Sequence, residues 1–389
     1  MVTIVNGGFS AHKLEMPSHK KALKFMINQI RKSFAGAKEC RHGGLVQEAA
    51  SILGAEPLDF SANINPLGSP PLKELLLEEL EHIGHYPDNR YTEFRKAAAS
   101  FVEVLPGNIV PANGSSEMIR LFSETTLCEG DVAIIPFPTF GEYENQSRLF
   151  GALIRRTDLG PFGELNVTDS SLKDAKCIFL CNPNNPTGSL LPRSRVEELA
   201  RRCEHFETFL LVDEAFIELS DPDQSVARLA PQMSFITVMR SLTKSFGVPG
   251  LRLGFGVTND EMAKIMSRAR IPWSISSIAS AAAVELLIKH REHLEKARYV
   301  IKNELVWLAD QLERLGLKPC RSSVNFILVN IVLSGLPSAE LAQRMADMGI
   351  LVRDCQSFGL GENYIRVAVR NRDENERLIA ALKSVLCVE

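Results

Sequence analysis

The sequence predicts an α/β protein with a mainly parallel sheet between layers of helices, followed by a smaller α+β unit. From about residue 106 to 270, short apolar runs alternate with stretches of helical spacing. Such alternation is typical of a parallel sheet with helices on both faces. After residue 283 a long helical region is followed by strand-like runs and a closing helix, which indicates a separate unit. A chain of 389 residues is long enough for two such lobes.

The predicted strands and helices follow from the spacing of apolar residues. The strands of the first unit are β-rich runs bounded by turn residues: Val132–Ile135, Cys177–Cys181, Phe209–Asp213 and Phe235–Val238. The helices between them are Glu117–Leu127, Glu142–Leu149 and Arg193–Arg202. Residues 283–316 are expected to form one long helix or two. The last elements are the strands Ser323–Val329, Leu351–Arg353 and Tyr364–Val369 and the helix Arg372–Leu386.

The first 40 residues differ from the rest in charge. Basic residues outnumber acidic ones there, and an apolar pattern predicts a helix across residues 19–33. We interpret this extension as an arm that packs on the body or on a second subunit. The alternative is a basic tail for an anionic surface. The predicted domain limits are 1–40 for the arm, 41–72 for the first part of the small domain, 73–285 for the large domain and 286–389 for the rest of the small domain.

Composition excludes several classes of protein. A net charge of −3 and a pI near 6.3 argue against a nucleic-acid partner. Apolar runs such as Ile278–Ile288 are too short or too rich in alanine to span a bilayer, and no signal peptide is evident. The eight cysteines form no C-x-x-C pair, which predicts free thiols in a reducing cytoplasm. His290 and His293 can share a helix face, but no further ligands accompany them, and we expect no metal site.

The segment Met239–Gly254 carries the strongest chemical signal. Lys244 lies between two small hydroxyl residues, Thr243 and Ser245, and Arg252 follows in a glycine-flanked turn. A lysine amine attacks carbonyls well only when burial or cationic neighbours lower its pKa. Arginine and hydroxyl groups suit a phosphate dianion. The segment therefore suggests a Schiff base to a phosphorylated aldehyde, pyridoxal 5'-phosphate. The alternative is an exposed loop lysine near a structural arginine.

Two shorter motifs are compatible with the same cofactor. Asn113–Ser116 precedes a predicted helix, where free backbone N–H groups favour a phosphate. A plain helix cap would use the same residues. Phe140 follows the next strand and offers an aromatic face to a flat heterocycle, although such a residue is more often part of the core.

Two motifs at predicted strand ends are more specific. The prolines and glycine of Cys181–Gly188 set a loop where the ligands of parallel sheets gather, and Asn185 could donate its amide to a phenolate oxygen. Asp213 ends a strongly apolar strand, where a carboxylate is costly unless paired. A pyridinium nitrogen is a suitable partner, because the ion pair keeps the ring electron-withdrawing. The alternative for Asp213 is a buried structural acceptor.

The order of these motifs resembles the fold-type I pyridoxal-phosphate enzymes of the aspartate aminotransferase superfamily. Within this superfamily, the segment from about residue 40 to residue 388 resembles the threonine-phosphate decarboxylases of cobalamin biosynthesis, which are related to the histidinol-phosphate aminotransferases. The resemblance implies a large domain whose sheet is of the seven-stranded type. It also implies a homodimer. The strings that carry it are His42-Gly43-Gly44, Asp59–Gly68, Ile271–Ser274, Tyr364–Arg370 and Asn375–Leu378.

The resemblance implies roles for the cofactor-binding residues. Lys244 would form the Schiff base and carry protons, and Asp213 would hold the pyridinium. Asn185 would bind the ring hydroxyl, and Phe140 would stack on the ring. Tyr86 would reach the cofactor phosphate of the second subunit. The remaining residues of this set surround the phosphate: Gly114, Ser115, Ser116, Ser241 and Arg252.

The resemblance also implies a substrate and a reaction. The residues around the substrate would be His42, Gly43, Asn63, Asn185, Arg353 and Arg366. Two arginines on a substrate phosphate would leave the carboxylate perpendicular to the ring, to depart as carbon dioxide. The expected reaction is decarboxylation of O-phospho-L-threonine to (R)-1-amino-2-propanol O-phosphate for the cobalamin nucleotide loop.

Alternatives and departures from the family pattern remain. The alternatives are a histidinol-phosphate or related aminotransferase and a phosphoserine decarboxylase. A cofactor-binding regulator would need a DNA-reading module, for which the first 40 residues are too short.

Many aminotransferases have tyrosine where this chain has Phe216, so no phenol would help to tune the ring oxygen. The phosphate loop reads Gly-Ser-Ser-Glu, where relatives often carry an acidic residue after the glycine.

Overall fold

The computed structural model describes residues 26, 28, 30–37, 43, 44, 46–160 and 164–386. Contacts divide the chain into Met1–Lys38 and Glu39–Glu389. In the first unit Lys32–Ala35 form helix α2, and the helix expected at 19–33 falls largely outside the described residues. The other predicted domain limits stay a prediction. Everything below concerns the second unit.

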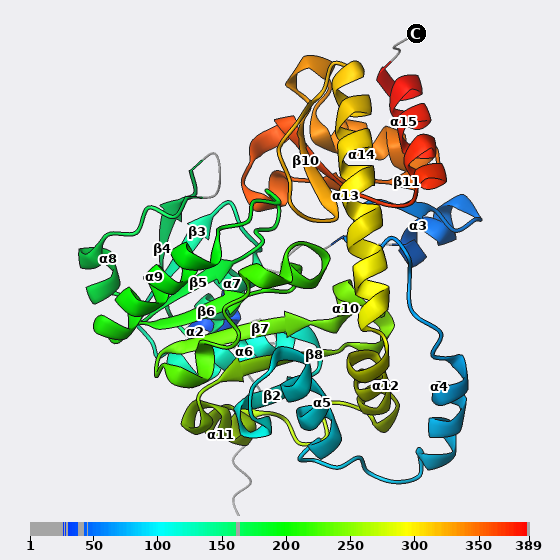
Figure 1. Cartoon of the computed structure of the whole chain (residues 1–389). Coiled ribbons are helices and arrows are strands. Elements are labelled where there is room, and N and C mark those ends of the chain that lie inside the picture. The colour runs from blue at the N-terminus through cyan, green and yellow to red at the C-terminus, as the bar shows by residue number, and fades with distance from the viewer. Residues whose placement is uncertain are drawn as a thin grey trace, which may run out of the picture. The chain divides into compact units, whose positions relative to one another are not determined.

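A seven-stranded sheet forms the centre of the larger part of this unit (Figure 1). All neighbouring strands are parallel except β8, which is antiparallel to both of its neighbours. The strands in spatial order are β2 (Ile109–Ala112), β8 (Gly254–Thr258), β7 (Ile236–Ser241), β6 (Phe209–Asp213), β5 (Cys177–Cys181), β3 (Val132–Phe137) and β4 (Leu153–Asp158).

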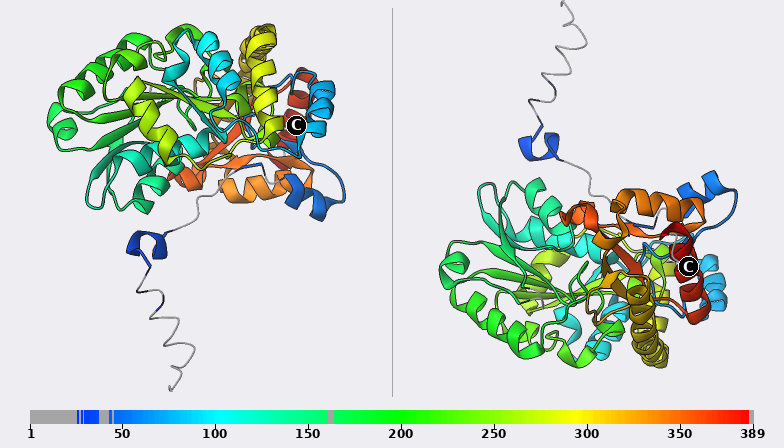
Figure 2. Two further views of the ribbon diagram at one scale, coloured as in Figure 1. Left: turned by 90° about the horizontal axis from the view of Figure 1, so that it is seen from below. Right: turned by 90° about the horizontal axis from the view of Figure 1, so that it is seen from above.

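Helices cover both faces of this sheet (Figure 2). The helices of this part are α4 (Lys73–Glu79), which packs on α12, and α5 (Thr92–Val102), α6 (Gly114–Thr126), α7 (Glu142–Leu149), α8 (Asp169–Lys173), α9 (Arg193–His205), α10 (Leu242–Ser245), α11 (Asp260–Ala269) and α12 (Ser277–Lys289). Successive side chains of a strand point to opposite faces of the sheet and therefore pack into different cores. Ile178 and Val212 pack with α5, α9 and α12, whereas Phe179 and Leu211 pack with α6, α7 and α11. The sheet is therefore buried on both sides.

The chain ends in a smaller α+β part with a core of its own. Its antiparallel sheet has the order β12 (Arg353–Asp354), β13 (Tyr364–Ala368), β10 (Phe326–Asn330) and β9 (Lys318–Pro319). A parallel pair joins β1 (Leu58–Asp59), near the start of the unit, to β11 (Ile350–Leu351). The helices are α3 (Val46–Leu53), α13 (Arg291–Arg314), α14 (Ser338–Asp347) and α15 (Arg372–Leu386).

The sequence predicted the buried elements best. The predicted class, a mainly parallel sheet between helices with a smaller α+β part, is confirmed. Four predicted elements have their observed bounds unchanged: β5, β6, α7 and α15. Of the predicted helical region 283–316, residues up to Arg314 belong to two helices, which separate at His290. The predicted strand Leu351–Arg353 was wrong, because its residues divide between β11 and β12 in different sheets.

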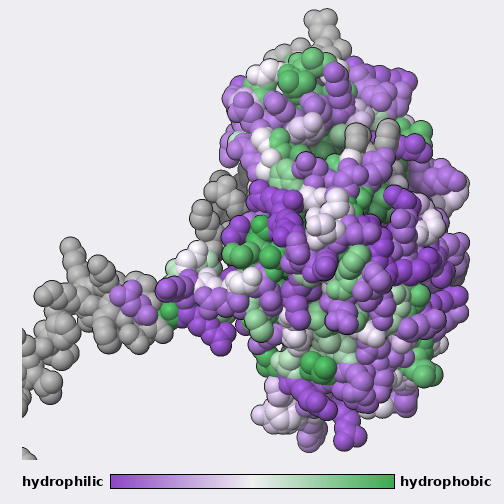
Figure 3. Space-filling view, turned by 90° about the vertical axis from the view of Figure 1, so that its left-hand side faces the viewer, coloured by the Kyte–Doolittle hydropathy of each residue, from purple (hydrophilic) through white to green (hydrophobic). Residues whose placement is uncertain are grey.

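The surface and the cysteines agree with the composition. On the face in Figure 3, hydrophilic residues predominate and hydrophobic residues form small groups. Among the described helices, none has both the length and the apolar character needed to cross a membrane. The six cysteines within the described residues are free thiols: Cys128, Cys177, Cys181, Cys203, Cys320 and Cys355.

Candidate active site

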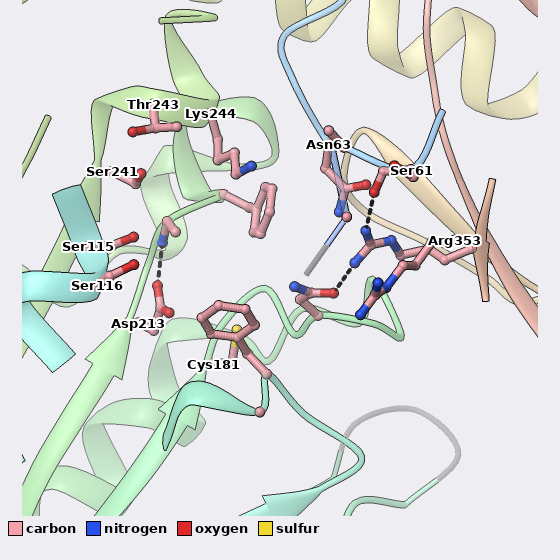
Figure 4. Close-up of a pocket in the computed structure, with 18 of the residues that line it drawn as sticks. Ser61, Asn63, Ser115, Ser116, Cys181, Asp213, Ser241, Thr243, Lys244 and Arg353 are labelled. Carbon is pink, nitrogen blue, oxygen red and sulfur yellow. Dashed lines mark hydrogen bonds between the residues drawn. The ribbon is translucent and has the colours of Figure 1, made fainter. Parts of the chain in front are cut away.

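A cavity of about 330 Å³ opens at the carboxyl ends of β5, β6 and β7, which are neighbours in the sheet (Figure 4). Cys181, Asp213 and Ser241 end these strands, and all three line the cavity. Ligands of open parallel sheets collect at this edge. The cavity brings together most of the residues predicted from the sequence: Gly43, Asn63, Ser115, Ser116, Phe140, Asn185, Asp213, Ser241, Lys244, Arg252, Arg353 and Arg366.

Asp213 lies at the deep end of this cavity and is 5% exposed. Its Oδ1 accepts a hydrogen bond from the backbone N–H of Ala215 at 2.9 Å. Its Oδ2 accepts one from the hydroxyl of Tyr143 at 2.5 Å. Burial raises the pKa of Asp213 to about 6, although both hydrogen bonds act in the opposite direction. A cation placed beside this carboxylate would relieve the cost of its burial.

Lys244 lines the same cavity from the short helix α10, directly after β7. Burial, with the positive charges of Arg366 and Arg252, lowers the pKa of Lys244 to about 8. A larger fraction of this amine is therefore neutral near pH 7 than for an exposed lysine. Lys244 and Asp213 share one small cavity, as the proposed chemistry requires.

Hydroxyl groups and Arg252 line a second side of the cavity. Ser115 and Ser116 are in the first turn of α6, where unpaired N–H groups and the helix dipole favour an anion. The hydroxyl of Ser241 is buried without a hydrogen-bond partner among the described residues. Gly114 does not line the cavity, but it permits this arrangement: its φ is +78°, and a Cβ there would lie 2.7 Å from Nη2 of Arg252.

The opposite side of the cavity carries two arginines from the C-terminal part. Arg366, on β13, is 5% exposed, and burial lowers its pKa to about 10. It donates to the side-chain oxygen of Asn185 and, at 2.7 Å, to the backbone oxygen of Ser61, while its Nε is left without a partner. Arg353, on β12, donates to the hydroxyl of Ser357 at 2.8 Å. Both guanidinium groups are thus positioned before any ligand binds.

The hydrogen bond from Arg366 also orients Asn185. Because the side-chain oxygen of Asn185 accepts this bond, its amide nitrogen remains for another acceptor. The loop that carries Asn185 is held by paired bonds between Asn182 and Leu191, of 3.1 and 2.8 Å. The proline-rich string after β5 therefore presents a fixed amide to the cavity.

Aromatic rings form part of the cavity wall. Phe140 lines the cavity and meets Tyr143 edge to face, with ring centroids 5.7 Å apart. Phe216 also lines it and packs against Phe326 at 5.1 Å. Phe216 carries no hydroxyl, so this wall is apolar at the position where many aminotransferases have tyrosine.

Besides Gly114, one further predicted residue within the described part of the chain does not line the cavity. Tyr86 is 81% exposed, and its ring centroid lies 4.7 Å from that of Trp273. It lies outside the cavity of its own chain. His42 falls outside the described residues, although its neighbour Gly43 lines the cavity.

The most important residue that the sequence did not indicate is Tyr143. It is fully buried on α7, three residues after Phe140, and its hydroxyl is bonded to Asp213. Burial and the adjacent carboxylate raise the pKa of Tyr143, which keeps the hydroxyl protonated as a donor. Cys181, opposite Asp213 in the sheet, has a pKa raised by burial and is a neutral thiol. A buried tyrosine in a helix looks like core, so only its spacing from Phe140 could have drawn attention to it.

The donor set fits an anionic, aldehyde-bearing heterocycle and not a metal. Four cationic side chains line the cavity, and Asp213 is the only carboxylate among its described lining residues. In the part of the chain that the structure describes, no group of three or more His, Cys, Asp or Glu side chains could hold a metal ion. The partnerless Ser241 hydroxyl, the amine of Lys244 and the buried Asp213 match the phosphate, aldehyde and ring nitrogen of pyridoxal phosphate.

Comparisons with known proteins agree with this geometry. The threonine-phosphate decarboxylase of Salmonella typhimurium is 36% identical over 358 residues, which cover 89% of this chain and 96% of that protein. The histidinol-phosphate aminotransferase of Methanocaldococcus jannaschii is 31% identical over 377 residues, covering 92% and 98%. The crystal structure of L-threonine-O-3-phosphate decarboxylase from Porphyromonas gingivalis superposes with a TM-score of 0.76 at 26% identity, covering 85% of this chain and 99% of that one.

A family model covers most of the chain. Residues 55–382 match the model for aminotransferase class I and II. This range includes the seven-stranded sheet, Lys244 and both arginines of the C-terminal part. The chain is a member of the aminotransferase class I and II family.

Proposed function

We propose that this protein is a pyridoxal-phosphate-dependent decarboxylase that converts O-phospho-L-threonine to (R)-1-amino-2-propanol O-phosphate. The observation that carries the proposal is the pair Arg353 and Arg366, which face the cavity in addition to Arg252. One arginine suffices for the cofactor phosphate, so two remain for a substrate that is itself phosphorylated. The similarity to two threonine-phosphate decarboxylases supports the same substrate.

The cofactor is pyridoxal 5'-phosphate, which the family uses. When bound, it draws electrons from the substrate bond that stands perpendicular to its ring, and the protein determines which bond that is. In this proposal Ser115, Ser116, Ser241 and Arg252 hold the phosphate. Lys244 holds the aldehyde, and because the pKa of its amine is lowered to about 8, its Nζ can both accept and return a proton near neutral pH.

Asp213 and Asn185 orient the cofactor ring in this proposal. Asp213 pairs with the ring nitrogen and keeps a proton there, which compensates the cost of burying the carboxylate. Asn185 donates its amide nitrogen to the ring oxygen, with its own oxygen held by Arg366. Phe140 lines the cavity, where its ring would stack on the cofactor and exclude water.

Arg353 and Arg366 would select the bond that breaks. If they hold the substrate phosphate, the carboxylate is not tied down and can stand perpendicular to the ring and leave as carbon dioxide. Asn63, 2% exposed and with a side-chain oxygen that has no partner, offers a further contact to the substrate. Gly43 lines the same side, and His42 is proposed to join it from the segment before.

We also propose a homodimer. Tyr86 projects from its own chain and does not reach the cavity of that chain, so a contact with a cofactor phosphate requires a second copy. Sedimentation of the purified protein would test the assembly. Loss of cofactor affinity in Tyr86→Phe would test the contact, and an unchanged affinity would remove Tyr86 from the site.

Two related activities remain as alternatives. The 31% identity to a histidinol-phosphate aminotransferase favours amine transfer with the same fold and a phosphorylated substrate. Phosphoserine is a second candidate substrate, because one methyl group changes discrimination by only about 1–3 kcal/mol. Cofactor-loaded protein should therefore be incubated with phosphothreonine, with phosphoserine, and with histidinol phosphate plus 2-oxoglutarate. We expect carbon dioxide and an aminopropanol phosphate from the first, and amine transfer without carbon dioxide would overturn the proposal.

A further inference from the structure

A second cavity lies between the start of α5 and the end of α11 and shares no residue with the candidate active site. Four of the side chains that line it are cationic, and none is acidic. Ser267 adds a hydroxyl group, whereas the hydroxyl and the N–H of Thr92 already donate to Asp88. The four cations are Arg90, Arg95, Lys96 and Arg270.

Arg270 lacks the partners that a buried arginine normally has. It is 6% exposed, and its single hydrogen bond among the described residues runs from Nη2 to the backbone oxygen of Asn89 at 2.7 Å. Its Nε and Nη1 have no partner there. Its guanidinium lies 4.4 Å from the ring centroid of Tyr91. A buried charge without a carboxylate is costly, so this site is incomplete in the protein alone.

Arg95 increases the positive charge at the floor of this cavity. It donates to the backbone oxygen of Ile109 and, at 2.8 Å, to the hydroxyl of Ser267, and neither acceptor is charged. Burial lowers the pKa of both Arg95 and Arg270, and the pKa of Arg95 is lowered further by Arg270. Two like charges therefore lie close enough to repel each other, and Asp88, the carboxylate that acts on both, is not among the residues that line the cavity.

The acidic residues nearby are already engaged. Asp88 accepts bonds from the N–H and hydroxyl of Thr92, and Glu93 pairs with Lys96 at 2.8 Å. Glu117, which also acts on Arg270, accepts bonds from Asn113 and Ser274. Asp260, beside Gly107, pairs with Lys264. None of these carboxylates lines the cavity.

We propose that this second cavity binds a phosphate-class dianion, either inorganic phosphate or the phosphate group of a small metabolite. Planar guanidinium groups and a lysine match the oxygens of a phosphate, and the hydroxyl of Ser267 adds a donor. Arg95 and Arg270 form the floor, and Arg90 and Lys96 form the exposed rim. The inference does not depend on the reaction proposed for the first cavity.

The chain carries its own optical reporter for this site. The backbone N–H of Trp273 donates to the side-chain oxygen of Asn89 at 3.0 Å, and the backbone oxygen of the same asparagine accepts from Arg270. The other tryptophan, Trp307, is on α13 beneath Arg372. In a Trp307→Phe background Trp273 is the chain's single tryptophan, and its fluorescence reports on the segment around Asn89, Arg270 and Tyr86.

The test is a titration of cofactor-loaded Trp307→Phe protein with inorganic phosphate, against potassium chloride of matched ionic strength. We expect a saturable change with phosphate and none with chloride. The rim variant Arg90→Gln/Lys96→Gln should raise the midpoint concentration about tenfold or more, and Arg270→Gln should abolish the change. Arg268→Gln, on the same helix but outside the cavity, is the matched control and should leave the midpoint unchanged. Repeating the titration with phosphothreonine distinguishes a metabolite phosphate from the free ion.

Three results would overturn the proposal. The first is an equal response to chloride, and the second is a midpoint that the rim variant does not move. The third is loss of the signal in Arg353→Gln instead of the rim variant, which would place the phosphate in the first cavity. Because the rim residues are exposed, their substitution tests the site even if Arg270→Gln fails to fold.

Discussion

The two sides of the candidate active site are built in different ways. On the side of the seven-stranded sheet, Asp213 ends β6 and Lys244 closely follows the adjacent strand β7, so these two strands fix their backbone positions. On the opposite side, Arg353 and Arg366 come from the short antiparallel sheet of the C-terminal part. Arg366 is held there by contacts to two other segments, through Asn185 and Ser61.

This difference separates the residues that take part in the chemistry from the residues that select the substrate. The sheet side contains the groups with shifted pKa values, Asp213 and Lys244, which suit a cofactor and a moving proton. The C-terminal side contains permanently charged groups that can only hold and orient an anion. We infer that changes on the sheet side affect turnover or cofactor retention, whereas changes on the C-terminal side affect substrate affinity and the choice of bond.

The largest effect is expected from Lys244→Ala. Removal of the amine deprives the cofactor aldehyde of its partner and the reaction of its proton carrier, so activity should fall by roughly 10⁴-fold or more. Absorbance of the lysine-linked cofactor near the visible edge should disappear as well. Lys264→Ala, an exposed lysine on α11, is the matched control and should change neither. Retention of the absorbance band in Lys244→Ala would show that another amine holds the cofactor.

A smaller effect of a different kind is expected from Arg353→Lys and Arg366→Lys. Lysine keeps the charge but loses the planar fork, and each variant should raise the KM for phosphothreonine by about 10- to 100-fold. The cofactor absorbance should persist, because neither residue is on the phosphate side. Arg344→Lys, an exposed arginine on α14, serves as the control. Normal turnover of phosphothreonine by either variant would contradict the proposed grip.

A third substitution examines the phosphate side without replacing a charged residue. In Gly114→Ala the new Cβ would meet Nη2 of Arg252 at 2.7 Å, so the guanidinium must move. We expect cofactor affinity to fall about tenfold, measured by equilibrium titration. Gly130→Ala is a close control, because Gly130 has a similar φ of +88° but nothing within 4 Å of its Cβ. Equal loss of affinity in both variants would attribute the effect to backbone strain.

How much of the fold the sequence could predict depended on burial. β5 and β6 are apolar throughout and were predicted with their observed bounds, because strands buried on both faces leave a continuous apolar run. β4 is at the edge of the sheet and includes Arg155 and Arg156, so it has no such run. β8 begins Gly-Phe-Gly, and only pairing with β2 and β7 makes it a strand.

The candidate active site likewise contains residues that the sequence could predict and contacts that it could not. Lys244, Asp213 and Asn185 could be proposed from the sequence, since each stands in a motif whose residue types imply a chemistry. The contact of Tyr143 with Asp213 joins residues 70 positions apart, and that of Arg366 with the Ser61 backbone joins residues 305 apart. Local patterns do not encode such distant pairings. A backbone carbonyl, as at Ser61, leaves no residue-type signal at all.

The smallest expected effect concerns stability, and it tests whether the sheet side is strained without its cofactor. Burial raises the pKa of Asp213 from 3.8 to about 6, so between these pH values the folded protein retains a proton that the unfolded chain has lost. The contribution of Asp213 to the free energy of unfolding should therefore decrease as pH rises from about 4 to about 6, and the loss persists above that range. An asparagine side chain cannot ionise, so Asp213→Asn should remove this decrease. Without cofactor the variant should exceed the parent at pH 7 by on the order of 2 kcal/mol and match it near pH 4.

Urea unfolding of both proteins, stripped of cofactor, at several pH values measures this difference. Asp174→Asn removes an exposed carboxylate and should leave the pH profile of the parent unchanged. Addition of the cofactor should reverse the order of stability, because only the carboxylate can pair with the ring nitrogen, and ligand binding stabilises the folded state by mass action. A difference in stability between parent and Asp213→Asn that is the same at pH 4 and at pH 6 would mean that ionisation of Asp213 costs the folded protein little. The sheet side would then be preorganised by its hydrogen bonds with Tyr143 and Ala215, and the two sides of the cavity would be alike in this respect.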